Sequence, residues 1–217
     1  FKLSGKLDYL FDCETPVEEA YQNILRPTDH EHFADLGAYR GDTIAELLHF
    51  AGGCERVFAF EPDEKTHKKL CLAVEQMGLA GRATCVQMAA YSHQQTLEFD
   101  SRGGRQSALR EESLVTGAAG AAKPKIKLVQ GQSLDNVAGE ETVTLINMDV
   151  EGAERQALEG CAKIIARDRP KMLIAAYHRS EDLFAIPLQI AAMRSDYRFY
   201  LRHYPYIPAW DTNLYCV

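Results

Sequence analysis

The chain has 217 residues, of which 46% are hydrophobic and 25% are charged, and this balance indicates a folded globular protein rather than a disordered one. The chain has 24 basic and 31 acidic side chains, and the resulting formal net charge of −7 disfavours an extended surface that binds nucleic acid. Its uncharged runs are too short to cross a bilayer, nothing near Phe1 resembles a signal peptide, and the six cysteines are dispersed, so we expect a cytoplasmic protein without a disulfide or zinc scaffold.

Residues 1–30 are predicted to form a short N-terminal helical extension. Apolar side chains recur there at helical spacing from Val17 to Leu25, and Pro27 ends the pattern. Residues 31–217 then alternate between strand and helix patterns, which requires parallel strands joined by right-handed crossovers in one α/β domain. The predicted strands are 33–38, 56–61, 84–89, 142–149 and 172–177, and the predicted helices begin near Thr43, at Pro62, shortly before Ala157 and at Leu183.

The middle and the end of the chain are less regular. A short strand is predicted at 97–99 and a half-exposed strand at 125–128, with a long loop of small residues at 101–124 between them. A loop of that length in a compact domain is often a functional lid, so 101–124 is a candidate substrate cover. The strands predicted at 197–200 and 214–217 form an antiparallel hairpin, because no helix pattern connects them. The expected fold is therefore a doubly wound, mostly parallel α/β sheet flanked by helices.

The first polar signal follows the first strand of this domain, where the run DLGAYRGDT begins at Asp35 and carries Gly37 and Gly41. Open parallel sheets bind ligands beyond the carboxyl ends of their strands, and glycine lets the backbone approach a ligand closely. The run lacks the third glycine of a dinucleotide-binding GxGxxG turn, so a pyrophosphate would find less backbone around it. The alternative is a structural strand-to-helix turn in which Asp35 caps backbone groups.

Two further strand ends carry weaker signals. Glu61 ends the second strand, where a carboxylate can accept hydrogen bonds from both hydroxyls of a ribose. Alternatively, Glu61 is a surface residue or a favourable charge at a helix N-terminus. The third strand ends in Ala89 and Ala90, small apolar residues that could border an adenine ring or belong to an ordinary core.

The strongest polar signal is the pair of carboxylates after the apolar strand at 142–149. Asp149 ends the strand and faces the cleft in such a sheet, whereas Glu151 or Glu154 could simply cap the next helix. His178 follows another strand, and its ordinary pKa suits a base near neutral pH. Asp149 and Glu151 could share a divalent cation, but the sequence offers no clear third ligand, so no metal is predicted.

Four segments together resemble the FkbM family of S-adenosylmethionine-dependent methyltransferases, namely FADLGAYRGDT, VFAFEP, AAYSHQQTLEF and INMDVEGAE. The resemblance runs from about His32 onward and implies a seven-stranded Rossmann-like sheet with a reversed last strand, S-adenosylmethionine as cofactor, and methyl transfer usually to oxygen. The family often has Glu in the segment that reads AAYH at 175–178 here, which leaves His178 as the polar candidate. The cofactor-binding residues implied by the resemblance are Asp35, Gly37, Tyr39, Asp42, Thr43, Glu61, Pro62, Ala89, Ala90 and Asp149.

The sequence therefore predicts methylation of a hydroxyl group on a small-molecule or glycan acceptor. Methyl transfer from a sulfonium is an in-line displacement, in which the protein aligns the reactants and excludes water. The predicted catalytic residues, which could take the proton of the hydroxyl, are Asp149, His178 and Glu151. Two alternatives stay open on the same fold: a nicotinamide-dependent oxidoreductase, and a non-catalytic module that binds S-adenosylmethionine.

Overall fold

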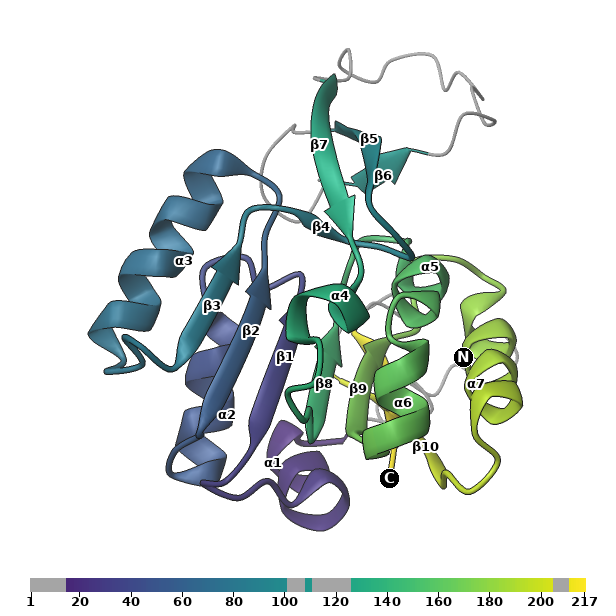
Figure 1. Cartoon of the computed structure of the whole chain (residues 1–217). Helices are drawn as coiled ribbons and strands as arrows, with labels where there is room; N and C mark the ends of the chain where they lie inside the picture. Colours follow the sequence, from purple (N-terminus) through teal and green to yellow (C-terminus); the bar gives the residue numbers. More distant parts are fainter. Residues whose placement is uncertain (1–14, 101–107, 111–125, 205–210) are drawn as a thin grey trace, which may run out of the picture.

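The computed structural model describes residues 15–100, 108–110, 126–204 and 211–217, and its centre is a seven-stranded sheet (Figure 1). The strand order is β10-β11-β9-β8-β1-β2-β3, in which β11 runs antiparallel to both of its neighbours and the other pairs are parallel. This confirms the expected doubly wound α/β fold with a reversed last strand. The strands are β1 (His32–Leu36), β2 (Arg56–Phe60), β3 (Ala83–Val86), β8 (Leu145–Met148), β9 (Lys171–Ala175), β10 (Phe199–His203) and β11 (Thr212–Cys216).

Helices cover both faces of the sheet, which explains why the central strands are apolar on both sides. One apolar cluster packs α4, α5, α6 and α7 against one face, and a second cluster packs η2, α2 and α3 against the other. The short helix α1 leads directly into η2, which buries Tyr21 and Leu25 in the second cluster. The helices are α1 (Val17–Glu19), η2 (Ala20–Leu25), α2 (Asp42–Ala51), α3 (Glu64–Gln76), α4 (Leu134–Ala138), α5 (Glu154–Glu159), α6 (Ala162–Asp168) and α7 (Asp182–Met193).

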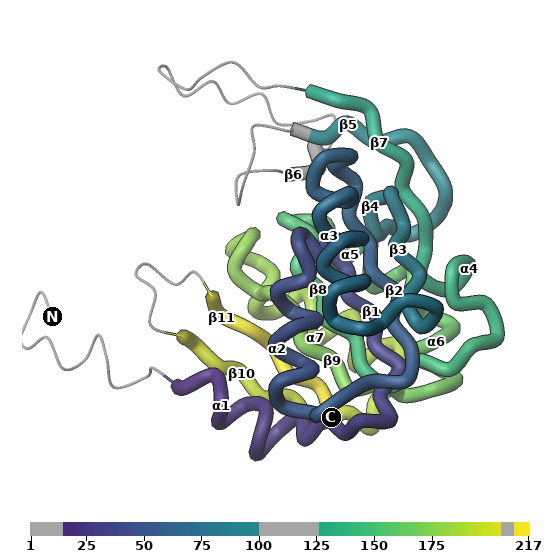
Figure 2. Tube along the Cα trace, turned by 90° about the vertical axis from the view of Figure 1, so that its left-hand side faces the viewer, coloured from purple at the N-terminus to yellow at the C-terminus, as the bar shows by residue number. Residues whose placement is uncertain are grey.

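A second sheet of four strands, in the order β4-β7-β5-β6, was not predicted. The strand expected at 84–89 is wrong as a single element, because β3 ends at Val86 and the chain then turns away. Both views show the second sheet beyond the carboxyl ends of β1, β2 and β3 (Figures 1 and 2). It therefore stands over the edge where a parallel sheet binds its ligand. Its strands are β4 (Ala89–Ala90), β5 (Gln95–Asp100), β6 (Ala108–Arg110) and β7 (Ile126–Gln132).

Two helix predictions need correction. Helix α3 begins at Glu64 rather than at Pro62, because the Asp63 side chain accepts hydrogen bonds from the backbone N–H groups of Lys65 and Thr66 and so caps the helix. The helix through Ala157 ends before Gly160 as expected, but α6 follows it and was missed.

The long loop expected at 101–124 contains β6 at 108–110, and the rest of that candidate lid lies outside the described residues. Within the described segments, no helix combines the length and the apolar character that a passage through a bilayer requires.

Candidate cofactor and catalytic site

Backbone hydrogen bonds hold the carboxyl ends of β1, β2 and β8 together. The amide groups of Gly37 and Ala38 donate to the carbonyl oxygen of Phe60 at 3.2 and 2.8 Å. The amide of Asp149 donates to the carbonyl of Leu36 at 2.9 Å. The turn after β1 is thereby bonded to the strand ends on both sides, so the candidate site residues that follow β1, β2 and β8 are neighbours in space.

Position 37 requires glycine because the turn after β1 lies very close to the backbone at Asp149. Its φ of +97° is a backbone conformation that favours glycine, and a Cβ added there would lie 1.9 Å from the backbone oxygen of Asp149. Tyr39 and Glu151 also have positive φ, at 46° and 56°. Such conformations in residues other than glycine concentrate at functional sites. The turns after β1 and β8 both contain one.

A cavity of about 1040 Å³ opens at these strand ends. Ligand pockets usually measure about 300–1,000 Å³, so this one can hold a nucleoside-sized cofactor together with part of a second ligand. Every cofactor-binding residue predicted above lines the cavity except Asp35, and Glu151 lines it as well. The predicted residues in its wall are Gly37, Tyr39, Asp42, Thr43, Glu61, Pro62, Ala89, Ala90, Asp149 and Glu151.

Asp35 lies beneath the cavity rather than in its wall. Its side chain is fully buried, and Oδ1 accepts a 2.7 Å hydrogen bond from Asn147 Nδ2 on β8. Oδ2 has no hydrogen-bond partner among the described residues. Burial raises the pKa of this carboxyl group to about 7, although the bond from Asn147 opposes the shift. Asp35 thus links β1 to β8 directly behind the site.

Glu61 presents a buried carboxylate to the cavity. It is 7% exposed, and Oε1 accepts a 2.7 Å hydrogen bond from the backbone N–H of Asp63. Burial raises the pKa of Glu61 to about 7, while backbone hydrogen bonds from Asp63 and Tyr39 favour the charged form. The carboxylate is therefore held in place from two loops, and its charge changes with pH near neutrality.

Asp149 carries a carboxylate with two different oxygen environments. Oδ2 accepts a hydrogen bond from the Tyr177 hydroxyl at 3.2 Å. Oδ1 is shielded from solvent and has no hydrogen-bond partner among the described residues. Burial raises the pKa of Asp149 to about 6, and the nearby His178 opposes that shift. Asp149 is therefore charged at neutral pH and a stronger base than an ordinary aspartate.

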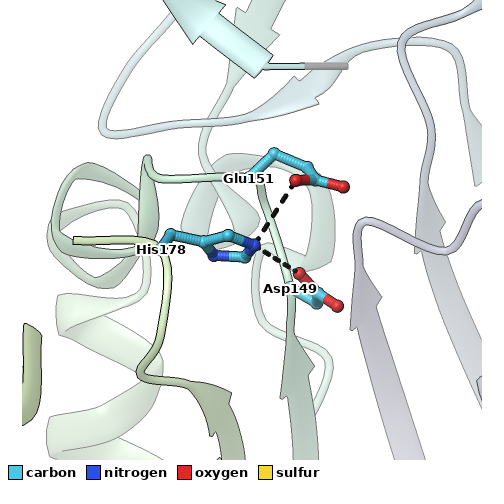
Figure 3. A group of neighbouring side chains, drawn as sticks. All are labelled: Asp149, Glu151 and His178. Carbon is cyan, nitrogen blue, oxygen red and sulfur yellow. Dashed lines mark ion pairs between the residues drawn. The ribbon is translucent and has the colours of Figure 1, made fainter. Parts of the chain in front are cut away.

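His178 contacts three carboxylates, those of Asp149, Glu151 and Glu154, and Figure 3 shows the first two beside its ring. Nδ1 is 2.8 Å from Glu154 Oε1, and Nε2 is 3.5 Å from Asp149 Oδ1 and 3.4 Å from Glu151 Oε2. Burial lowers the pKa of His178, but hydrogen bonds and charge from the carboxylates outweigh it and raise the pKa to about 10. With that pKa the ring already holds a proton at neutral pH, which leaves Asp149 as the candidate proton acceptor.

A family model, the methyltransferase FkbM domain, matches residues 35–207 of the chain. The chain belongs to the FkbM methyltransferase family. The crystal structure of methyltransferase FkbM from Methylobacillus flagellatus KT has a TM-score of 0.77 and 28% identity to this FkbM domain. That match covers 100% of this chain and 52% of the other, so the chain spans about half the length of that relative. A comparison with curated proteins finds no match.

More distant solved structures resemble this FkbM domain in fold only. An rRNA methylase from Streptococcus thermophilus has a TM-score of 0.57 at 13% identity, with 94% of this chain and 96% of the other covered. A putative methyltransferase of Streptococcus mutans, SMU.1697c, in complex with S-adenosylhomocysteine has a TM-score of 0.52 at 14% identity, covering 94% and 99% of the two chains. Aeropyrum pernix fibrillarin with bound S-adenosylmethionine has a TM-score of 0.50 at 14% identity, covering 96% and 74%.

The second sheet of the FkbM domain supplies cavity residues that the sequence reading missed. Lys127 on β7 belongs to the strand that was predicted to be half-exposed, and its side chain is 41% exposed, but Nζ also lies 2.9 Å from Asp63 Oδ2 and the residue lines the cavity. Phe99 on β5 lines it too. The capping role of Asp63 could have been predicted from the sequence, since aspartate directly before a helical pattern is a common N-cap. The Lys127 contact could not be predicted, because nothing in the local pattern shows that Lys127 of β7 lies beside the residue that caps α3.

Proposed function

We propose that this FkbM domain transfers a methyl group from S-adenosylmethionine to an oxygen atom of a small-molecule or glycan acceptor. The observation that carries the proposal is the convergence of Gly37, Glu61 and Asp149 on one cavity. Each residue comes from a different strand end, and a carboxylate at the second of these ends is the usual partner of a ribose in such sheets.

The residues present fit S-adenosylmethionine. The Glu61 carboxylate is buried beside the cavity and can accept hydrogen bonds from the two ribose hydroxyls. Ala89 and Ala90 provide a small apolar wall suited to an adenine ring. Two solved structures that contain S-adenosylhomocysteine or S-adenosylmethionine share this fold, which supports the assignment of the cofactor.

The cofactor supplies a methyl group that is already activated on a sulfonium. The chain therefore has to position the acceptor oxygen, exclude water and accept one proton. Asp149 is suited to the last task, because its pKa of about 6 leaves it unprotonated at neutral pH. The Tyr177 hydroxyl holds Oδ2 of that carboxylate, and so fixes its orientation toward the cavity.

The acidic side chains in the cavity wall suit an uncharged, hydroxyl-bearing acceptor. Glu46, Glu151 and Asp211 line the cavity in addition to the residues assigned to the cofactor, and the basic residues Arg40, Lys65 and Lys69 line it as well. Acidic side chains accept hydrogen bonds from hydroxyl groups and repel phosphate backbones. The net charge of −7 points the same way, so a nucleic-acid acceptor is not proposed.

Transfer of radiolabelled methyl groups from S-adenosylmethionine to a panel of hydroxylated small molecules and oligosaccharides tests the proposal. We expect labelled product in which the new methyl is bound to oxygen, and no product with Asp149→Ala. Thermal unfolding with S-adenosylhomocysteine and with NAD⁺ separates the rival functions, since only a true ligand of the folded state raises the melting temperature. Stabilisation by NAD⁺ alone would favour an oxidoreductase. Cofactor binding without transfer to any acceptor would favour a binding module.

A further inference from the structure

Three side chains of different types meet beyond the ends of two neighbouring strands, beside the cavity wall to which Asp149 and Glu151 belong (Figure 3). Asp149 and Glu151 follow β8, and His178 follows the neighbouring strand β9. One ligand-type atom from each of them lies within 4.8 Å of the other two. Asp149 and Glu151 are close in sequence, whereas a third ligand is not apparent from the sequence. The parallel pairing of β8 with β9 brings that third ligand beside them.

The separations between these atoms are long for hydrogen bonds and suitable for a shared metal ion. His178 Nε2 lies 3.5 Å from Asp149 Oδ1 and 3.4 Å from Glu151 Oε2. Charge-assisted N–H···O bonds are about 2.7–2.9 Å long. Two ligands bound tetrahedrally to one ion at about 2.1 Å lie about 3.4 Å apart. The two distances at His178 therefore match the edges of a metal coordination shell.

An independent observation concerns Asp149 Oδ1. This oxygen is shielded from solvent, and no donor among the described residues satisfies it, although the other oxygen of the same carboxylate is held by Tyr177. A buried carboxylate oxygen without a donor is costly unless a cation or a donor compensates it. The unsatisfied oxygen is the atom of Asp149 that faces His178 Nε2.

Glu154 orients the histidine in the way that metal sites require. Its Oε1 lies 2.8 Å from His178 Nδ1 and accepts the backbone N–H groups of Val150 and Gly152 at 3.1 and 3.3 Å. The Glu154 side chain is itself 1% exposed, so it is fixed by burial as well. Metal-binding histidines commonly donate their second ring N–H to a carboxylate in this manner. Nε2 is thereby left to face the other two carboxylates.

We propose that Asp149, Glu151 and His178 bind one divalent first-row transition-metal ion beside the cavity wall formed by Asp149 and Glu151. One imidazole nitrogen with two carboxylate oxygens suits Zn²⁺, Mn²⁺ or Co²⁺ better than Ca²⁺ or Mg²⁺, which prefer oxygen ligands alone. Because Asp149 and Glu151 line the cavity, an acceptor oxygen can complete the coordination shell of the ion. This role in the reaction rests on the proposed methyl transfer. The binding of the metal itself does not depend on that proposal.

Metal binding is measured directly with the metal alone. Chelator-treated protein is dialysed against Zn²⁺ or Co²⁺, and bound metal is counted by elemental analysis and by the absorption spectrum of Co²⁺. We expect one ion per chain in the wild type and at least tenfold weaker binding for His178→Gln and Glu151→Gln. Glu154→Gln, which leaves all three ligands in place, should weaken binding by about 10- to 100-fold through loss of the oriented ring. His49→Gln and Glu159→Gln, at exposed positions of α2 and α5, are matched controls and should bind like the wild type.

The proposal is overturned if the wild type binds no Zn²⁺ or Co²⁺, or if the three variants bind as tightly as the two controls. It is also overturned if Co²⁺ binding is unchanged by the variants and its spectrum shows sulfur ligation, which would point to thiols such as Cys71. Circular dichroism and the melting temperature establish that each variant is folded. If His178→Gln does not fold, Glu151→Gln decides, because the Glu151 side chain is one-third exposed on a turn. Metal binding without any methyl transfer would contradict the proposed function and leave this inference intact.

Discussion

Gly37 lies so close to Asp149 that a Cβ at position 37 would fall 1.9 Å from the backbone carbonyl oxygen of Asp149. The turn after β1 and the turn after β8 are thus in direct backbone contact. This contact sets the spacing between the loop assigned to the cofactor and the carboxylate assigned to the reaction. A side chain at position 37 would separate the two halves of the site.

Gly37→Ala should therefore destabilise the domain far more than a comparable change elsewhere. Gly52 is the matched control, because it also has a positive φ, of +79°, but has no atoms within 4 Å of an added Cβ. Gly52→Ala should cost about 1–2 kcal/mol, the usual penalty of a left-handed backbone for a residue with a side chain. Gly37→Ala should cost at least about 2 kcal/mol more, because of the overlap with the Asp149 carbonyl. If urea unfolding shows that both variants lose the same free energy of unfolding, the close approach between Gly37 and Asp149 does not affect stability.

Asp35→Asn should stabilise the protein above neutral pH. Burial raises the pKa of Asp35 from 3.8 to about 7, so the folded state keeps a proton that the unfolded state releases between these values. Stability then falls as pH rises from about 4 to 7, and the full penalty, at most about 4 kcal/mol, is present above pH 7. The variant removes this ionisation and can still accept the bond from Asn147.

Urea unfolding of wild type and Asp35→Asn at a series of pH values measures this difference. It should be largest above pH 7 and should vanish near pH 4. Asp29→Asn, whose side chain is 67% exposed, serves as the control and should follow the wild type. A stability difference that does not change between pH 4 and pH 8 would contradict the assigned ionisation.

The affinity for S-adenosylhomocysteine should fall as pH drops below about 7. Glu61 has a pKa of about 7 and accepts ribose hydroxyls best as a carboxylate, so protonation competes with the ligand. The loss can reach tenfold per pH unit below that pKa. Asp35 and Asp63 also face Glu61 and contribute to its pKa.

Calorimetric titrations between pH 5.5 and 8.5 test this dependence. Glu61→Gln should bind weakly and with little change across the range. Asp35→Asn should keep a clear pH dependence, because Glu61 still titrates in that variant. A wild-type affinity that is constant over the whole range would count against the role of Glu61.

Substitutions at Asp149 and Tyr177 should reduce turnover without removing the cofactor. Asp149→Ala should keep the fold and abolish methyl transfer, because the proton acceptor is lost. Tyr177→Phe removes the hydroxyl that holds Asp149 Oδ2 and should lower kcat by about tenfold, the effect of one hydrogen bond to a charged group. Tyr200→Phe, on β10, is the control and should retain wild-type kcat. Full activity of Asp149→Ala with an authentic acceptor would refute the assignment.

The sequence predicts the main sheet well because its strands are short apolar runs between helical patterns. The strand at 142–149 is an example, since it is apolar almost throughout and becomes the buried strand β8. Polar residues directly after such strands fall at one edge of the sheet by topology alone. Gly37, Glu61 and Asp149 could therefore be assigned to one site without knowledge of any distance.

The missed features depend on contacts between segments that are distant in sequence. β4 has only two residues and β6 only three, too few for any periodicity, so only β5 and β7 of the second sheet left a local signal, as the strands predicted at 97–99 and 125–128. The contacts of His178 with Glu151 and Glu154 depend on how the loops after β8 and β9 face each other. From its ordinary pKa, a histidine after a strand is predicted to be a base. The three carboxylates around His178 raise its pKa, and they are visible only in the structure.

A crystal structure of the protein with S-adenosylhomocysteine would show whether the three strand ends form the cofactor site. We expect ligand density in the cavity, with both ribose hydroxyls within hydrogen-bond distance of the Glu61 carboxylate and the sulfur on the side of Asp149. Density for the ligand at another place, or a ribose that does not contact Glu61, would contradict this expectation.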